Sequence, residues 1–94
     1  MTYDEVALAL QVALLGEVFP TLRGVGFTLE NAKVQLLFFH DGAISEEDYE
    51  SASCIETELM ASLPRSANVV SEVIRVDSPN LIPDRGRWVY RRRE

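Results

Sequence analysis

His40 and Asp41 are the residues whose types and spacing most directly suggest chemistry, because a histidine beside a carboxylate can act as a general acid or base. Ser51, Ser53 and Cys54 follow as potential nucleophiles. No nucleophile elbow or comparable motif places one of these groups against the imidazole. The sequence therefore does not support a catalytic site, and we expect no enzymatic activity.

Three consecutive acidic residues, Glu46, Glu47 and Asp48, are candidate metal ligands. On a helix this spacing scatters them around the axis, and the Gly turn and regularly spaced oxygens of a calcium loop are missing. With Ser45 before them they are better interpreted as a helix-capping signal, since the helix dipole favours carboxylates in the first turn. One cysteine and one histidine in the chain also exclude Cys-based zinc modules and histidine clusters. We expect no metal and no cofactor.

The charge of the 94-residue chain, −6 overall, is distributed unevenly. Residues 1–62 hold eleven acidic and two basic residues, whereas residues 63–94 hold four acidic and seven basic residues, all arginines. An acidic surface repels nucleic acid and steers basic partners toward it. The stretch from Trp88 to Arg93 mixes aromatic residues with arginines, which suits base stacking but also a protected edge strand. The upstream acids favour the edge strand, so we expect no nucleic-acid partner.

The length permits one domain, residues 1–94, with enough apolar residues (47%) for a single core. Asp4 and Glu5 stand where a secretory signal would carry basic residues. The longest apolar stretch, Val6 to Leu15, is interrupted by Gln11 and is too short to cross a bilayer. We therefore expect a cytoplasmic protein that does not bind membranes.

A first helix is predicted over residues 3–19, because Thr2 and Glu5 form a capping box and Pro20 ends the pattern. Its apolar residues form two adjacent stripes, wider than a surface helix needs. The first contains Tyr3, Ala7, Leu10, Leu14 and Val18, and the second contains Leu8, Val12, Leu15 and Phe19. The second stripe is covered either by another helix of the domain or by a second chain, and we favour the helix.

A second helix is predicted from the Ser45 cap to about Leu63, before Pro64. Its buried stripe is predicted to contain Tyr49, Ala52, Leu59, Met60 and Leu63. The opposite face carries Glu47, Glu50, Cys54 and Glu58. With Asp41 at the entry to the helix, the three glutamates of this face are the expected partner-binding residues.

Glu56 falls inside the predicted buried stripe of the second helix, where a carboxylate must be paired, protonated or left at an edge. An ion pair with Arg75, or a hydrogen bond from Tyr90 or Trp88, would satisfy it. Direct contact with a partner is the alternative. We expect Glu56 and Arg75 to be a structural buried charge pair.

Four strands are predicted, over residues 22–29, 34–39, 68–77 and 86–92, the first two joined by a hairpin at 30–33 in which Asn31 tolerates positive φ. Gly24 and Gly26 indicate close backbone approach or a bulge. Trp88 and Tyr90 are expected on the same face of the last strand. The predicted fold is α+β, a two-layer α/β sandwich of order α-β-β-α-β-β, with two helices and a four-stranded, mostly antiparallel sheet.

Four stretches, DGAISEED (41–48), SCIETE (53–58), IRVDSP (74–79) and WVYRR (88–92), give the chain a resemblance to a known group. It resembles the small acidic immunity proteins of bacterial contact-dependent-inhibition and polymorphic-toxin systems. The resemblance implies a non-enzymatic protein that binds and neutralises a toxin made by its own cell or its kin. A nuclease is the toxin that best suits an acidic inhibitor, because its cleft is basic. The alternative is a non-catalytic homodimeric interaction module that uses the first helix, so the free protein is expected to be a monomer or a homodimer.

Overall fold

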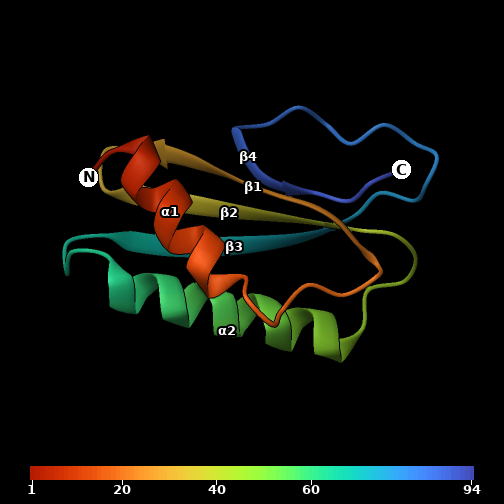
Figure 1. The fold of residues 1–94 in the computed structure, drawn as a ribbon, viewed down its shortest axis with the longest axis horizontal. Helices are drawn as coiled ribbons and strands as arrows, with labels where there is room; N and C mark the ends of the chain where they lie inside the picture. The colour runs from red at the N-terminus through yellow and green to blue at the C-terminus, as the bar shows by residue number, and fades with distance from the viewer.

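A computed structural model describes residues 1–94, and its elements follow the predicted order α-β-β-α-β-β (Figure 1). The elements are α1 (Tyr3–Ala13), β1 (Leu22–Glu30), β2 (Lys33–His40), α2 (Glu46–Ser62), β3 (Asn68–Arg75) and β4 (Arg87–Arg91). The strands form one sheet in the order β3-β2-β1-β4. β1 is antiparallel to β2 and β4, while β3 is parallel to β2. The expected α+β fold with a mostly antiparallel sheet is confirmed.

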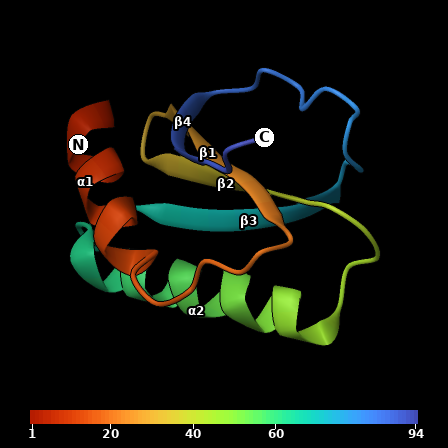
Figure 2. The ribbon, with the colours of Figure 1, turned by 45° about the vertical axis from the view of Figure 1, so that its right-hand side comes forward.

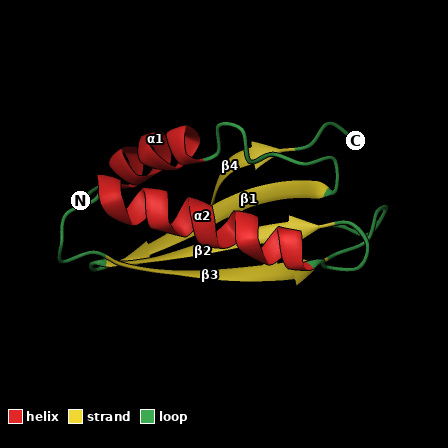
Figure 3. Cartoon of the chain, turned by 90° about the horizontal axis from the view of Figure 1, so that it is seen from below, coloured by secondary structure: helices red, strands yellow, loops and turns green.

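Both helices lie on one face of the sheet, as the view from below shows (Figure 3). α2 connects the parallel strands β2 and β3, because a parallel pair needs a crossover that returns the chain to the same end of the sheet. α1 packs beside α2 (Figure 2). The main core fills the space between helices and sheet, with Val6 and Leu10 from α1, Ile55 and Leu59 from α2, and Phe27 among the sheet residues that they cover.

The fourth strand contains a bulge that the sequence pattern did not reveal. Val25 pairs with Tyr90, but the next residue, Gly26, pairs with Trp88, so Val89 is the extra residue. Trp88 and Tyr90 therefore lie on opposite faces, and the prediction of a shared face is wrong. Tyr90 packs against the main core, whereas the ring of Trp88 packs on Phe39 on the other side of the sheet.

The close approach predicted for Gly24 is confirmed, because a Cβ at this position would lie 2.9 Å from the Trp88 ring. A Cβ at Gly26 would lie 3.0 Å from the Arg87 carbonyl oxygen. The glycines thus let the bulged strand β4 and its tryptophan lie close against β1. The predicted hairpin is also present, with Asn31 at φ 55°.

The first helix is shorter than predicted, ending at Ala13 instead of residue 19. The chain turns after Leu14, and Gly16 adopts a φ of +81°, which glycine does without strain. Within α1 the fully buried residue Val6 lay outside both predicted stripes. The second stripe is not covered by another helix of the chain, since Leu8, Val12 and Leu15 are 65%, 66% and 76% exposed. That expectation is wrong.

The second helix has the predicted bounds, with Ser45 as its N-cap, but its buried face differs. Its buried residues are Asp48, Ser51, Ala52, Ile55 and Leu59, whereas Tyr49 and Met60 are exposed. Two polar residues can lie in this face because their side chains are satisfied. Asp48 completes a capping box with Ser45, and Ser51 donates to Glu17 in the turn after α1.

Candidate functional site

Two adjoining hollows lie between α2 and the chain that leaves α1. The larger, about 460 Å³, is lined by Val12, Ala13, Leu15, Glu17, Ser53, Cys54, Thr57 and Glu58. The smaller, about 300 Å³, is lined by Glu17, Phe19, Glu47, Glu50, Ser51 and Cys54. Because Glu17 and Cys54 border both, the two hollows make one depression, which we call the α1–α2 groove.

The three predicted partner-binding glutamates of α2 all line this groove. Glu47 and Glu50 border the smaller hollow and Glu58 borders the larger. All three are exposed, and none of them forms an ion pair within the chain. None of the nine basic residues of the protein lines either hollow. The groove is therefore an acidic surface without internal neutralisation.

A fourth carboxylate, Glu17, was missed by the sequence reasoning. The Ser51 hydroxyl donates a hydrogen bond of 2.9 Å to Glu17 Oε2, which orients the half-buried carboxylate at the junction of the two hollows. The helix predicted over residues 3–19 includes residue 17, and a continuous helix would not bring this residue to α2 in this way. Gly16 was the signal in the sequence that the helix ends before it.

Apolar side chains from the α1 side face the acidic wall of the groove. Val12 and Leu15 line the larger hollow and Phe19 lines the smaller. Val12 and Leu15 are mostly exposed, and Phe19 is 37% exposed. These residues belong to the stripe expected to be covered, and the structure leaves that stripe open beside the carboxylates.

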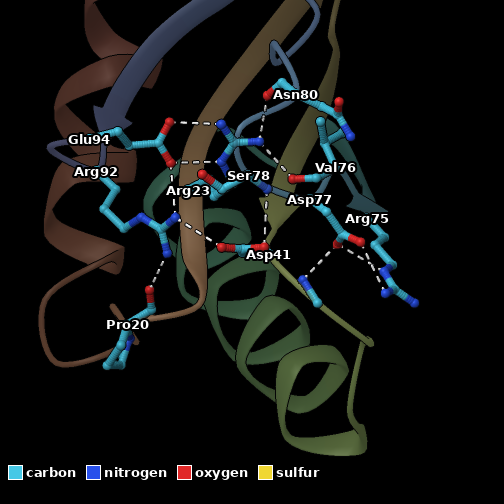
Figure 4. A network of polar contacts seen from close by, with 11 residues as sticks. Pro20, Arg23, Asp41, Arg75, Val76, Asp77, Ser78, Asn80, Arg92 and Glu94 are labelled. Atoms are coloured by element: carbon cyan, nitrogen blue, oxygen red, sulfur yellow. Dashed lines mark hydrogen bonds and ion pairs between the residues drawn. The ribbon is translucent and has the colours of Figure 1, made fainter.

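Asp41, the remaining predicted partner-binding residue, belongs to a separate cluster that we call the Arg23 network (Arg23, Asp41, Arg92 and Glu94; Figure 4). Asp41 accepts hydrogen bonds from the Ser78 backbone N–H at 3.1 Å and from Arg92 at 3.2 Å. Arg92 also donates to Glu94 and to the Pro20 carbonyl. Asp41 is thus held by internal contacts and does not line the groove.

Arg23 is the centre of this network and is only 3% exposed. Its guanidinium binds the Glu94 carboxylate through two hydrogen bonds of 2.7 Å and also donates to the carbonyls of Val76 and Asn80 (Figure 4). The hydrogen bonds from Arg23, reinforced by those from Arg92, lower the pKa of Glu94 to about 2. The network ties the end of the chain and the segment after β3 to β1.

The expected ion pair between Glu56 and Arg75 does not form. The side chain of Arg75 is 54% exposed and binds Asp77 through two hydrogen bonds, which raise the pKa of Arg75 and lower that of Asp77. Glu56 is half-buried and accepts a hydrogen bond from the Ser71 hydroxyl on β3. The buried face of α2 is rotated about the helix axis relative to the predicted one, so Glu56 lies at the edge of the contact between helix and sheet. There the neutral Ser71 hydroxyl is enough to satisfy its carboxylate.

His40 is buried at the end of β2, and its Nδ1 atom has no hydrogen-bond partner. Burial lowers the pKa of His40, and Asp48, at 3.7 Å, opposes that effect only in part. No serine or cysteine is hydrogen-bonded to this nitrogen. No group of three or more His, Cys, Asp or Glu side chains is arranged to hold a metal ion. None of the helices has the length and apolar character needed to cross a membrane.

A family model described as MafI2 immunity protein matches residues 3–94, nearly the whole chain. No curated protein matches the chain.

Proposed function

The chain belongs to the MafI2 immunity protein family, and from this membership we propose that it neutralises its toxin by covering a basic surface of that toxin with the α1–α2 groove. The family is one of non-enzymatic immunity proteins, and membership implies a cognate MafB toxin as the partner. What family membership leaves open is which surface of this protein binds the toxin, and which kind of toxin surface it fits.

The observation that carries the proposal is the convergence of Glu17, Glu47, Glu50 and Glu58 on a groove without a basic residue. Carboxylates that lack a basic partner within the chain keep their attraction for an approaching positive surface. All nine basic residues lie outside the groove, and five of them have acidic partners, as Arg23 has Glu94 and Arg87 has Asp4. The acidic surface expected on α2 thus also includes Glu17, from the turn after α1. Asp41 lies outside this surface, in the Arg23 network.

A nuclease is the toxin class we propose, since an enzyme that binds phosphates needs a basic cleft that an acidic groove can occupy. Such a toxin would be met in the cytoplasm, after delivery by contact between cells or during synthesis in the producing cell. Occupation of the cleft would exclude nucleic acid and so stop cleavage. This part of the proposal is tested by the activity of the toxin domain on RNA and DNA, alone and with the immunity protein.

The groove itself is tested by replacing Glu47, Glu50 and Glu58 together by Gln and measuring association with the cognate toxin domain at several salt concentrations. Charges at an interface act mainly on the association rate, and their effect is screened over about 8 Å at physiological salt. We expect the triple variant to associate about tenfold more slowly at low salt and with a weaker salt dependence.

A matched control replaces Glu5, Glu30 and Glu72 by Gln, which changes the net charge equally at residues that do not line the groove. The control variant should associate within about twofold of the wild-type rate. Equal slowing by both variants would mean that only the overall charge steers the toxin. Unchanged association of the groove variant would remove the groove from the binding surface.

A further inference from the structure

We propose that the α1–α2 groove receives a single amphipathic element of the toxin, in which a large apolar side chain lies next to a lysine or arginine. This inference rests on the proposed function and specifies the chemistry of the bound surface. It follows from the two unlike walls of the groove, an apolar wall of Val12, Leu15 and Phe19 and an acidic wall of Glu47, Glu50 and Glu58.

The apolar wall is unusual because its exposed residues gather around one depression. Single exposed apolar side chains are normal on protein surfaces, whereas here two of them line one hollow and a third lines the adjoining one. The larger hollow has a volume of about 460 Å³. This space suits one or two large side chains that project from a toxin segment.

The acidic wall specifies a cation beside that apolar side chain. Glu17 is half-buried and accepts a hydrogen bond from Ser51, which orients its carboxylate at the junction of the hollows. A lysine or arginine can lay its aliphatic stem on Val12 and Leu15 and bring its charged end to Glu17 or Glu58. A purely apolar element would leave these carboxylates desolvated and unpaired, at a cost in affinity.

A second copy of this chain is a poor occupant of the same groove. A two-fold symmetric dimer brings the same surface of both copies together, so the carboxylates of one groove would face those of the other. No basic residue lines the groove to compensate for that repulsion. Charge complementarity therefore favours a basic toxin element over self-association.

The test compares the double variant Val12→Ser and Leu15→Ser with the single variant Leu8→Ser, using the full chain and its cognate toxin domain. Leu8 is the control, because it is 65% exposed on α1, much as Val12 is, and does not line the groove. Apolar contacts at the centre of an interface act mainly on dissociation. We expect the double variant to dissociate at least tenfold faster with an association rate within twofold of wild type, and Leu8→Ser to match wild type. Unfolding of each free variant verifies that the fold is intact.

The outcomes separate this inference from the proposed function. If the serine variant binds like wild type while the glutamine variant of Glu47, Glu50 and Glu58 associates slowly, the acidic surface binds the toxin without an apolar anchor, and this inference fails alone. If neither variant changes binding, the proposed function fails as well. Sedimentation supplies a second readout, since a wild-type dimer that the serine variant converts to a monomer would overturn the inference in favour of a second copy.

Discussion

Ser71 on β3 donates a hydrogen bond to the carboxylate of Glu56 on α2 and so links the second helix to the edge strand of the sheet. This hydrogen bond satisfies the carboxylate for which the sequence predicts an ion pair with Arg75. Both partners are half-buried, so neither carboxylate nor hydroxyl is fully removed from water. Glu56 therefore has a modest structural role, in contrast with the fully buried charge of Arg23.

Glu56→Gln should lower the free energy of unfolding by less than about 1 kcal/mol, because a glutamine oxygen can still accept the hydrogen bond from Ser71. Denaturant unfolding of Glu56→Ala, Ser71→Ala and the double variant should give a coupling energy of about 1 kcal/mol. A loss of 3 kcal/mol in Glu56→Gln would instead reveal a buried ionic contact that the carboxylate alone can make.

Arg23→Met should destabilise the protein by about 2–4 kcal/mol, since it removes charge-assisted donors from the carbonyls of Val76 and Asn80 as well as from Glu94. The loss in stability is smaller than for a fully buried ion pair, because the Glu94 side chain is 30% exposed. Arg75→Met is the matched control, as Arg75 forms a similar two-bond contact with Asp77 at the surface. That control should lower the free energy of unfolding much less than Arg23→Met does, in thermal or denaturant unfolding, and equal losses would contradict the assigned role of burial.

Stability should fall between about pH 4.5 and pH 2 through the protonation of Glu94. The pKa of this carboxyl is about 2 in the folded protein, against an ordinary value of 4.5, so the unfolded chain takes up the proton first. The stabilising contribution is complete above about pH 4.5 and is lost as the pH falls through 2.

In Glu94→Gln, stability at pH 7 should be lower than in wild type, and the decline between pH 4.5 and 2 should be shallower. The measurement is urea unfolding at a series of pH values. Glu30→Gln serves as the control, because the carboxylate of Glu30 is exposed and makes no ion pair. Parallel pH profiles for wild type and Glu94→Gln would show that the Arg23 network does not stabilise the fold through Glu94.

Gly86→Ala should destabilise by about 3 kcal/mol or more, whereas Gly16→Ala should cost about 1 kcal/mol. Both glycines have positive φ, +70° and +81°, but only at Gly86 would an added Cβ collide with the backbone, at the Phe27 carbonyl. At Gly16 the space is open, so only the conformational strain applies. Thermal unfolding compares the two, and similar losses would mean that β4 can move away from β1 at little cost.

The sequence alone was sufficient for features that depend on neighbouring residues. Capping at Thr2 and Ser45, the Asn31 hairpin and the order of elements are encoded within a few residues, and all were predicted correctly. The outward acidic face of α2 likewise follows from helical spacing once the cap defines the start of the helix. The resemblance carried by residues 41–48 and the later stretches pointed to immunity proteins, and the family match agrees with it.

Only the tertiary structure decided features that depend on distant partners. Arg23 and Glu94 are 71 residues apart, and nothing local to either residue indicates that they meet. The bulge in β4, the choice of the buried stripe of α1 and the rotation of α2 likewise depend on how the layers pack. Helical periodicity identifies apolar stripes without specifying which stripe another element will cover. For this reason Val12 and Leu15 looked like core residues in the sequence, while the fold leaves them open beside Glu17 in the groove.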